Sequence, residues 1–326
     1  MLGKRGEDAP TLTAGQYKRL LSSLRDRGLQ LAELLTPSAP EILKDIQWDV
    51  ESERIQRLLD RGFLMSQAVE RWRARAIWVI GHDDEGYPPR LLERLGDDAP
   101  CILYGCGEPS ILNAGGLAVV GSRHTTDDLL NYSMEVGRLA AEAGACVISG
   151  AARGIDQAAM RGAIEARGRA AGVVADTLER ASTIRENRDI LMDGRLVLVS
   201  PYEPLAGFNV GNAMQRNKVV YALADAALVI SAEYEKGGTW AGAVEQLGRL
   251  RLVPVYVRSG NGSEKGLESL KRKGALLWPD PLTADELAGV LAGDPSSEVA
   301  VGQMTMNLSM VREERSEYGD EADRND

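Results

Sequence analysis

The chain has 326 residues and a formal net charge of −10, with 44% hydrophobic and 26% charged residues, which is an ordinary composition for a soluble globular protein. The net negative charge argues against a protein that binds nucleic acid over its whole surface. The first ten residues lack an apolar signal-peptide core, and no uninterrupted apolar stretch reaches the roughly 18 residues of a membrane helix. We therefore expect neither a signal peptide nor a transmembrane helix.

Cysteine and histidine are scarce. The three cysteines, Cys101, Cys106 and Cys146, are odd in number and form no C-x-x-C pair, which favours reduced thiols in a cytoplasmic protein over a disulfide framework. The two histidines, His82 and His124, have no partner at metal-ligand spacing. We expect no metal site and no cofactor.

Residues 1–72 predict a small helical N-terminal domain. After a start without a clear pattern, apolar residues recur at helical spacing in residues 13–35 and 52–72, separated by the proline-containing break at 37–40. Thr13 and Ser52 stand where N-caps are expected. The domain carries no chemical motif and is interpreted as a packing module.

Residues 73–290 alternate short apolar runs with helical patterns. Strands are expected near residues 77–80, 101–104, 117–120, 146–148, 170–174, 196–200, 227–231 and 252–257, and helices include 179–192, 211–224, 239–250 and 263–273. Such alternation predicts the α/β class, with an open, mostly parallel, doubly wound sheet. Residues 291–326 are expected to be a linker and a disordered acidic tail, because the last sixteen hold seven acids and three arginines.

Two of the predicted strands end in similar turns. Gly121-Ser122-Arg123 follows the run at 117–120, and Gly150-Ala151-Ala152-Arg153-Gly154 follows the run at 146–148. The segment between them has helical periodicity, so the unit is a βαβ crossover, in which ligands bind outside the carboxyl ends of the strands. A helix N-terminus offers free N–H groups and partial positive charge, so these turns suit phosphate.

Two later loops add further candidates, 214–218 (MQRNK) and 236–239 (KGGT). If all four loops face the same edge of the sheet, their cations converge into a basic pocket for phosphate groups. The complete predicted set of DNA- or phosphate-binding residues is Gly121, Ser122, Arg123, Gly150, Arg153, Arg216, Asn217, Lys218, Lys236, Gly237, Gly238 and Thr239.

The first two loops have alternative interpretations. Arg123 and Arg153 could pair with neighbouring acids such as Asp127 or Asp156 instead of binding an anion. Asp156 precedes a helical pattern and is interpreted as an N-cap, not as a catalytic acid.

The later loops are equally open to other interpretations. Arg216 and Lys218 could be solvated helix positions, and Thr239 could be a helix cap, a phosphate ligand or both. Tyr234 and Trp240 could stack on bases, although core or rim packing is the commoner role of an isolated aromatic residue.

Common enzyme motifs are missing from the chain, which has no G-x-x-x-x-G-K-[ST], no G-x-G-x-x-G after the first strand and no nucleophile elbow. Several segments in order do resemble the DNA-processing protein A (DprA/Smf) family over residues 78–280: DDEGYPPRL, VVGSR, VISGAARGID, QRNK, GGTWAGA and GALLWP. This resemblance implies an extended Rossmann-like fold shared with the LOG phosphoribohydrolases. It also implies a non-enzymatic protein that binds single-stranded DNA in a basic pocket, commonly as a homodimer, and delivers the strand to a RecA-type recombinase.

Departures from the family pattern indicate a divergent, shortened member. Ala159-Met160 replaces alanine-histidine, residues 237–243 (GGTWAGA) replace S-G-S-L-x-T-A, and Lys218 replaces an arginine. The chain also leaves no room for the C-terminal winged helix of many members. These departures motivate a second pathway hypothesis, DNA binding within a phage-defence or toxin–antitoxin module with a cognate protein partner.

An enzymatic alternative comes from the LOG proteins, which the GGT turn at 237–239 also resembles. Their motif places a glutamate three residues after the threonine, whereas Glu245 here lies six residues after Thr239. On a helix this turns the acid by about 60° and shifts it by nearly one turn. Glu233 and Glu235 are the other acids available for a nucleotide phosphoribohydrolase.

Overall fold

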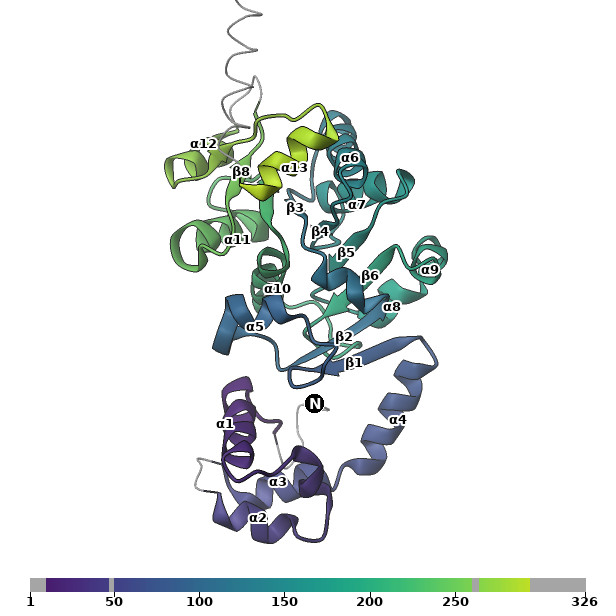
Figure 1. The fold of residues 1–326 in the computed structure, drawn as a ribbon, viewed down its shortest axis with the longest axis vertical. Helices are drawn as coiled ribbons and strands as arrows, with labels where there is room; N and C mark the ends of the chain where they lie inside the picture. The colour runs from purple at the N-terminus through teal and green to yellow at the C-terminus, as the bar shows by residue number, and fades with distance from the viewer. Residues whose placement is uncertain (1–9, 47–49, 260–263, 294–326) are drawn as a thin grey trace, which may run out of the picture. The chain divides into compact units, whose positions relative to one another are not determined.

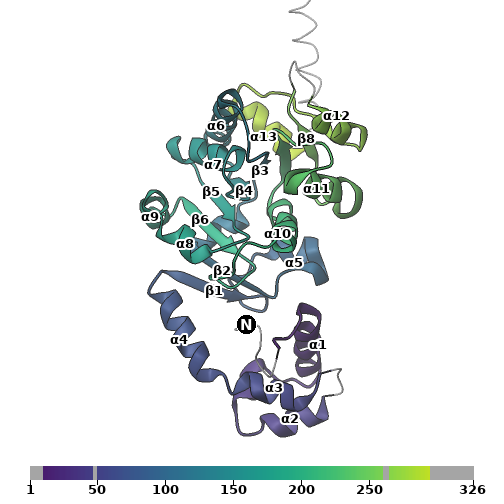
Figure 2. The ribbon, with the colours of Figure 1, turned by 180° about the vertical axis from the view of Figure 1, so that it is seen from behind.

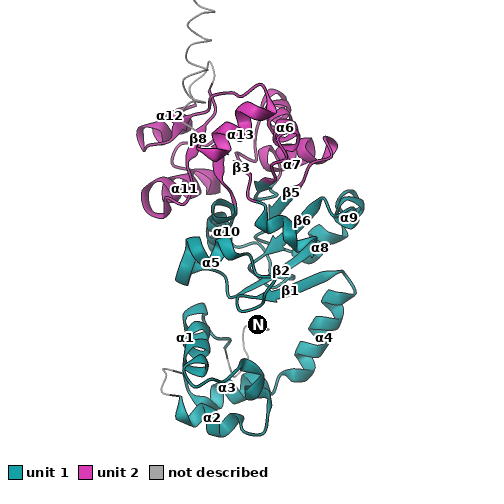
Figure 3. Ribbon diagram, in the orientation of Figure 1, with its two compact units in different colours: residues 1–114, 148–152, 170–223 teal, residues 115–147, 153–169, 224–326 magenta. Residues whose placement is uncertain are grey.

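The computed structural model describes residues 10–46, 50–259 and 264–293 (Figures 1 and 2). It divides into two compact units (Figure 3). Unit 1 comprises residues 1–114, 148–152 and 170–223, and unit 2 comprises residues 115–147, 153–169 and 224–326. Within the described ranges, no helix is both long enough and apolar enough to cross a membrane. The predicted disordered tail lies almost wholly outside the described residues.

Unit 1 begins with a cluster of short helices: α1 (Ala14–Arg25), the 3-10 helix η1 (Leu31–Leu35), α2 (Ala39–Asp45), α3 (Ser52–Leu59) and α4 (Gly62–Arg73). Thr13 caps α1 as expected, in a capping box with Gln16. Ser52 does not cap α3, because its hydroxyl donates to the Leu43 carbonyl oxygen (3.2 Å) and Glu51 occupies the N-cap position. The core of this cluster consists of Leu20, Leu24, Leu34, Leu43, Ile46, Val50 and Ile55.

The described residues also form a nine-stranded sheet with strand order β1-β2-β6-β5-β4-β3-β7-β8-β9. Its strands are β1 (Ile77–Gly81), β2 (Ile102–Gly107), β3 (Leu117–Val120), β4 (Val147–Ser149), β5 (Ala170–Val173), β6 (Leu196–Ser200), β7 (Ala226–Val229), β8 (Val255–Val257) and β9 (Leu276–Leu277). Strands β4 to β8 are short and wholly buried, as continuous apolar runs of a parallel sheet should be. The predicted α/β class with a mostly parallel, Rossmann-like sheet is confirmed.

In unit 1, β1 pairs with β2 and β2 with β6 antiparallel, whereas β5 and β6 are parallel. The helices of this part are α5 (Pro89–Leu95), α8 (Leu178–Thr183), α9 (Arg185–Met192) and α10 (Val210–Leu223), with 3-10 turns η2 (Gly96–Asp98) and η3 (Pro109–Asn113). The single helix predicted over 179–192 is wrong. Ile184 adopts an extended conformation (φ −63°, ψ 127°) and divides α8 from α9.

In unit 2, the pairs β3–β7, β7–β8 and β8–β9 are all parallel. The helices are α6 (Asp127–Glu142), α7 (Ile155–Glu165), α11 (Gly237–Glu245), α12 (Lys265–Arg272) and α13 (Ala284–Ala292). The π-helical segment η4 (Gln246–Leu250) continues α11, so the helix predicted over 239–250 changes its hydrogen-bond pattern in its second half.

Helices α6 and α7 lie side by side in unit 2 (Figures 1 and 2). Their close approach depends on two glycines. A Cβ atom on Gly137 of α6 would overlap the Ala159 carbonyl of α7, and a Cβ atom on Gly162 of α7 would overlap the Met134 carbonyl of α6. The two helices therefore pack backbone against backbone.

Candidate phosphate-binding site

The turn after β3 is built directly against the start of α7, within unit 2. A Cβ atom on Gly121 would overlap the Ile155 side chain. Gly154, which precedes α7, has a φ of +90°, and a Cβ atom there would lie 2.7 Å from the Ser122 carbonyl oxygen. Both positions require glycine, because a side chain would push the turn away from the helix N-terminus. Within unit 2, the first predicted glycine turn is thus in contact with Gly154, the last residue of the second.

Asp156 is a structural support of this turn. Its side chain is only 5% exposed, and Oδ1 accepts a hydrogen bond from the Gly121 N–H (3.3 Å). The prediction that Asp156 caps α7 is wrong, because Gly154 occupies the N-cap position and α7 has no side-chain cap. The carboxylate instead fixes the backbone at the end of β3.

A third and a fourth segment meet at the same turn. The Ser122 N–H donates to Oγ of Ser231, just beyond β7 (3.1 Å), and the Thr239 hydroxyl donates to the Gly121 carbonyl oxygen (2.8 Å). Val120 lies opposite Val229 in the parallel register, so the two strands end at the same edge. Ser231 was not predicted as a site residue, and its position at the end of a buried apolar run was the only signal in the sequence.

Thr239 is therefore not a helix cap. Lys236 occupies the N-cap position of α11, without a side-chain cap hydrogen bond, and Thr239 is the third residue of the helix. Its single hydroxyl proton is used by Gly121. Any phosphate at this helix would meet the backbone N–H groups of the first turn, which have no intrahelical acceptor.

Positive charge in unit 2 lies on the surface of these turns. Arg123, Arg153 and Lys236 are exposed, and each follows or joins a strand-end turn. The N-termini of α7 and α11 add partial positive charge from the peptide dipoles. Unit 2 thus presents three long cationic side chains and two helix N-termini around a backbone turn that is tightly held.

The remaining predicted residues belong to unit 1. Gly150 directly follows β4, and Arg216, Asn217 and Lys218 lie on α10. Arg216 and Lys218 are each only 7% exposed, so their interpretation as solvated helix positions is wrong. Lys218 Nζ lies 3.3 Å from the Asp98 carboxylate, which compensates the charge of a largely buried ammonium group.

Exposed apolar residues precede Arg216 in unit 1. Phe208 is 54% exposed, Val210 67% and Met214 40%. Nearby, the Tyr202 hydroxyl donates to the Asn212 carbonyl oxygen (3.0 Å), and burial raises the pKa of Tyr202 although the Arg216 charge lowers it. Of these side chains, the exposed aromatic ring of Phe208 is the kind on which single-stranded nucleic acids stack their bases.

The three acids available to the enzymatic alternative are either engaged in an ion pair or exposed on the surface. Glu245 forms an ion pair with Arg249 one turn later on the same helix (2.6 Å). Glu233 and Glu235 are exposed, and Glu235 adopts a positive φ of 56° in the turn before α11. Among the described residues, no cluster of three or more histidine, cysteine or acidic side chains is placed to hold a metal ion.

Parallel strands that end in small-residue turns, each leading into a helix N-terminus, define the extended Rossmann-like class of α/β proteins. Within that class the assignment is more specific. A family model described as DNA recombination-mediator protein A matches residues 78–286, and the chain belongs to this family.

Individual relatives agree with this family. The chain is 33% identical over 216 residues to Protein Smf of Escherichia coli strain K12, covering 62% of this chain and 54% of that protein. It is 26% identical over 192 residues to the DNA processing protein DprA of Bacillus subtilis strain 168, covering 58% of this chain and 63% of that protein. The matches thus span less than two thirds of either relative.

Solved structures of the same family share the fold. DNA processing protein A from Streptococcus pneumoniae superposes with a TM-score of 0.64 at 22% identity, covering 82% of this chain and 90% of that one. The Helicobacter pylori protein, whose structure addresses its single-stranded DNA binding mode, has a TM-score of 0.52 at 21% identity, covering 67% of this chain and 96% of that one.

Proposed function

We propose that this protein is a non-enzymatic binder of single-stranded DNA that acts in DNA processing. The observation that carries the proposal is the turn of Gly121 and Ser122 in unit 2, where Asp156, Ser231 and Thr239 hold the backbone while Arg123 remains exposed. A fixed backbone beside an exposed arginine suits repeated phosphate contacts, because little ordering is needed upon binding. Family membership supports the same conclusion.

Unit 1 supplies the complementary elements of the proposal. Arg216, Asn217 and Lys218 would contact phosphates, and the exposed ring of Phe208 would stack on bases. The net charge of −10 is compatible with this function, because the phosphate contacts are made by the cations at the site even when the rest of the surface is acidic.

The test is fluorescence anisotropy of a labelled oligo-dT strand over a series of salt concentrations. We expect the affinity to fall with salt at a logarithmic slope of about −0.7 per phosphate contacted. Arg123→Ala combined with Arg153→Ala should weaken binding at least about tenfold and flatten the slope by one to two units, if each arginine neutralises one phosphate.

The matched control is Arg138→Ala, since Arg138 is an exposed arginine of unit 2 that pairs with Glu135 and Glu142 on α6. It should leave affinity and slope unchanged. Absence of binding at low salt would reject the proposal. Release of free base from a nucleoside monophosphate would instead favour the phosphoribohydrolase alternative, for which the Gly237-Gly238-Thr239 helix start is the supporting feature.

The proposed partners follow from the family resemblance. They are a second copy of the chain and either a RecA-type recombinase or a cognate toxin or defence protein. Light scattering of the purified chain tests the homodimer. Co-purification from a host that expresses the neighbouring genes tests the choice between recombination and defence.

A further inference from the structure

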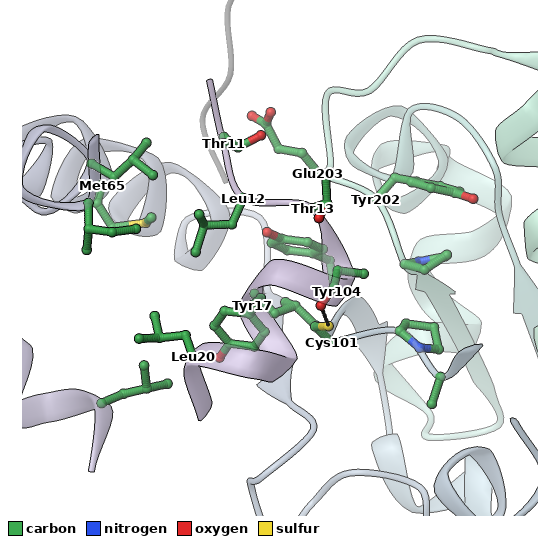
Figure 4. Close-up of a pocket in the computed structure, with 18 of the residues that line it drawn as sticks. Thr11, Leu12, Thr13, Tyr17, Leu20, Met65, Cys101, Tyr104, Tyr202 and Glu203 are labelled. Carbon is green, nitrogen blue, oxygen red and sulfur yellow. Dashed lines mark hydrogen bonds between the residues drawn. The ribbon is translucent and has the colours of Figure 1, made fainter. Parts of the chain in front are cut away.

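A large pocket lies within unit 1. Its volume is about 990 Å³, which is at the upper end of the range for small-molecule sites. It is lined by the first helices of the chain, by the segment that leads into β2 and by the segment after β6 (Figure 4). The proposed DNA function does not account for this pocket.

One end of the pocket is apolar. Leu12, Leu20 and Met65 lie there in Figure 4, and Ile55 and Leu58 of α3 also line the pocket. Aliphatic side chains and a flexible methionine accept an apolar body of variable shape, because each contact is non-directional and methionine adapts its rotamer.

The other end carries phenol rings and one carboxylate. Tyr104, Tyr202 and Glu203 line it, whereas Tyr17 lies beside Leu20 on α1 (Figure 4). Tyr104 is held edge-to-face against Trp72, with ring centroids 5.2 Å apart. Within the described part of the chain, the Tyr17 hydroxyl, the Tyr104 hydroxyl and the Glu203 carboxylate form no hydrogen bond with another side chain or backbone group. These polar groups therefore have hydrogen-bonding capacity for a guest.

The pKa values show that this end is desolvated. Burial is the main cause that raises the pKa of Glu203 above the usual carboxyl value, although the charge of Arg71 opposes this shift. The pKa of Tyr104 is raised by burial and additionally by the Glu203 charge. A partly desolvated carboxylate gains most from a cation brought next to it.

The charges around the pocket favour a cationic guest. Its lining includes the acids Asp97, Asp98 and Glu203 and the bases Arg61 and Lys218. Lys218 is paired with Asp98 (3.3 Å), so acids exceed bases among the remaining side chains. The faces of phenol rings add attraction for a cation, since their quadrupole presents negative charge.

We propose that this pocket binds an amphipathic organic cation, with its ammonium group at Glu203 near Tyr104 and its apolar body against Leu20, Ile55 and Met65. The inference does not depend on DNA binding, because Glu203, Tyr104 and the apolar residues named here lie outside the predicted phosphate-binding set, and Lys218 is the single lining residue that belongs to it.

Three probes with the same apolar body test the proposal: 4-phenylbutylamine, the neutral 4-phenylbutan-1-ol and the anionic 4-phenylbutyrate. Isothermal titration calorimetry of the full chain with each probe should show the amine binding at least about tenfold more tightly than the alcohol, and the carboxylate binding most weakly. Tightest binding of 4-phenylbutyrate would indicate that Arg61 and Lys218 bind the head group, and it would overturn the proposal. Equal affinities, or no binding of the amine, would overturn it as well.

Variants locate the binding site. Glu203→Gln should reduce the amine affinity about tenfold and leave the alcohol affinity unchanged, and Tyr104→Phe should weaken the amine to a smaller extent. Glu41→Gln, at an exposed glutamate of α2 that does not line the pocket, is the matched control. If the Glu203→Gln and Glu41→Gln variants bind the amine equally well, the Glu203 carboxylate does not bind the ammonium group. Oligo-dT binding measured on the same samples should not change.

Discussion

At the scale of single residues, Thr239 is a predicted phosphate-binding residue whose hydroxyl already forms a hydrogen bond within the protein. Its hydroxyl proton is donated to the Gly121 carbonyl oxygen across 118 residues of sequence. We expect Thr239→Val to lower the free energy of unfolding by about 1 kcal/mol, because a partly buried carbonyl then loses its donor.

Thr239→Ser keeps the donor and is the control for this prediction. Urea unfolding of the three proteins provides the measurement. The structural role would be refuted if Val and Ser variants had the same stability, or if Val reduced DNA affinity without any loss of stability.

Glu203 gives a prediction about pH. Its pKa in the folded chain is raised, chiefly by burial and also by the charge of Glu179, although Arg71 opposes the shift. A raised carboxyl pKa means that the folded state holds the proton more tightly than the unfolded state. The stabilisation is complete below the unfolded pKa and is lost as the pH rises through the folded pKa.

Glu203→Gln removes this loss, so the variant should gain stability relative to the wild type as the pH rises above about 4.3, the ordinary pKa of glutamate. Urea unfolding at several pH values between 4 and 8 measures the difference. Glu41→Gln serves again as the control for removing one negative charge. A difference that does not change with pH would show that burial of Glu203 has no consequence for stability.

At the scale of elements, the contact of α6 and α7 depends on Gly137 and Gly162. We expect Gly137→Ala and Gly162→Ala each to destabilise unit 2 by about 1–3 kcal/mol, because the added methyl group meets backbone atoms that cannot rotate away. The melting temperature measures the loss.

Gly15→Ala is the matched helical control. The nearest atom to its added Cβ is Arg19 Nη1 at 3.8 Å, and the higher helix propensity of alanine should make the change neutral or slightly stabilising. If Gly137→Ala were as well tolerated as Gly15→Ala, the two helices would not be in the close contact described.

Most of the elements could be predicted because hydrophobic periodicity is local. The runs at 117–120 and 196–200 coincide with β3 and β6. The break at Ile184 could not be predicted, since neither glycine nor proline marks it and only the backbone angles reveal it. The prediction that Asp156 caps a helix was wrong for a related reason. Its side chain accepts a hydrogen bond from Gly121, 35 residues away, and a local sequence pattern cannot show that contact.

The candidate site could also be predicted only in part. The glycine turns at 121 and 154 were visible from residue type, because only glycine fits such close contacts. The burial of Arg216 and Lys218 was not visible, since a short run of polar residues usually marks a solvated helix face. Neither the role of Ser231 nor the pocket at Glu203 could be inferred, because both depend on residues more than 100 positions apart.

At the scale of the whole molecule, charge is unevenly distributed. Residues 294–326 contain nine acids and three arginines, so a chain that ends at residue 293 loses more than half of the net charge of −10. We expect this truncation to tighten oligo-dT binding several-fold at low salt, and the gain to fade as the Debye length falls from about 10 Å at 0.1 M to about 3 Å at 1 M.

A second variant separates charge from chain length. Replacing the seven acids among the last sixteen residues with their amides should reproduce most of the gain without shortening the chain. Should the truncation tighten binding equally at all salt concentrations, the electrostatic explanation would be wrong.

The strand pairing also has a consequence for synthesis on the ribosome. Tyr104 of β2 lies opposite Ser200 of β6, and Leu117 of β3 lies opposite Ala226 of β7. Each of these strands leaves the exit tunnel well before its partner has been translated, and the two compact units are each assembled from three separate stretches of chain. Neither unit can fold as a contiguous nascent domain. Apolar strand edges therefore stay open during translation, which predicts slow folding and a need for chaperone protection until β7 has emerged.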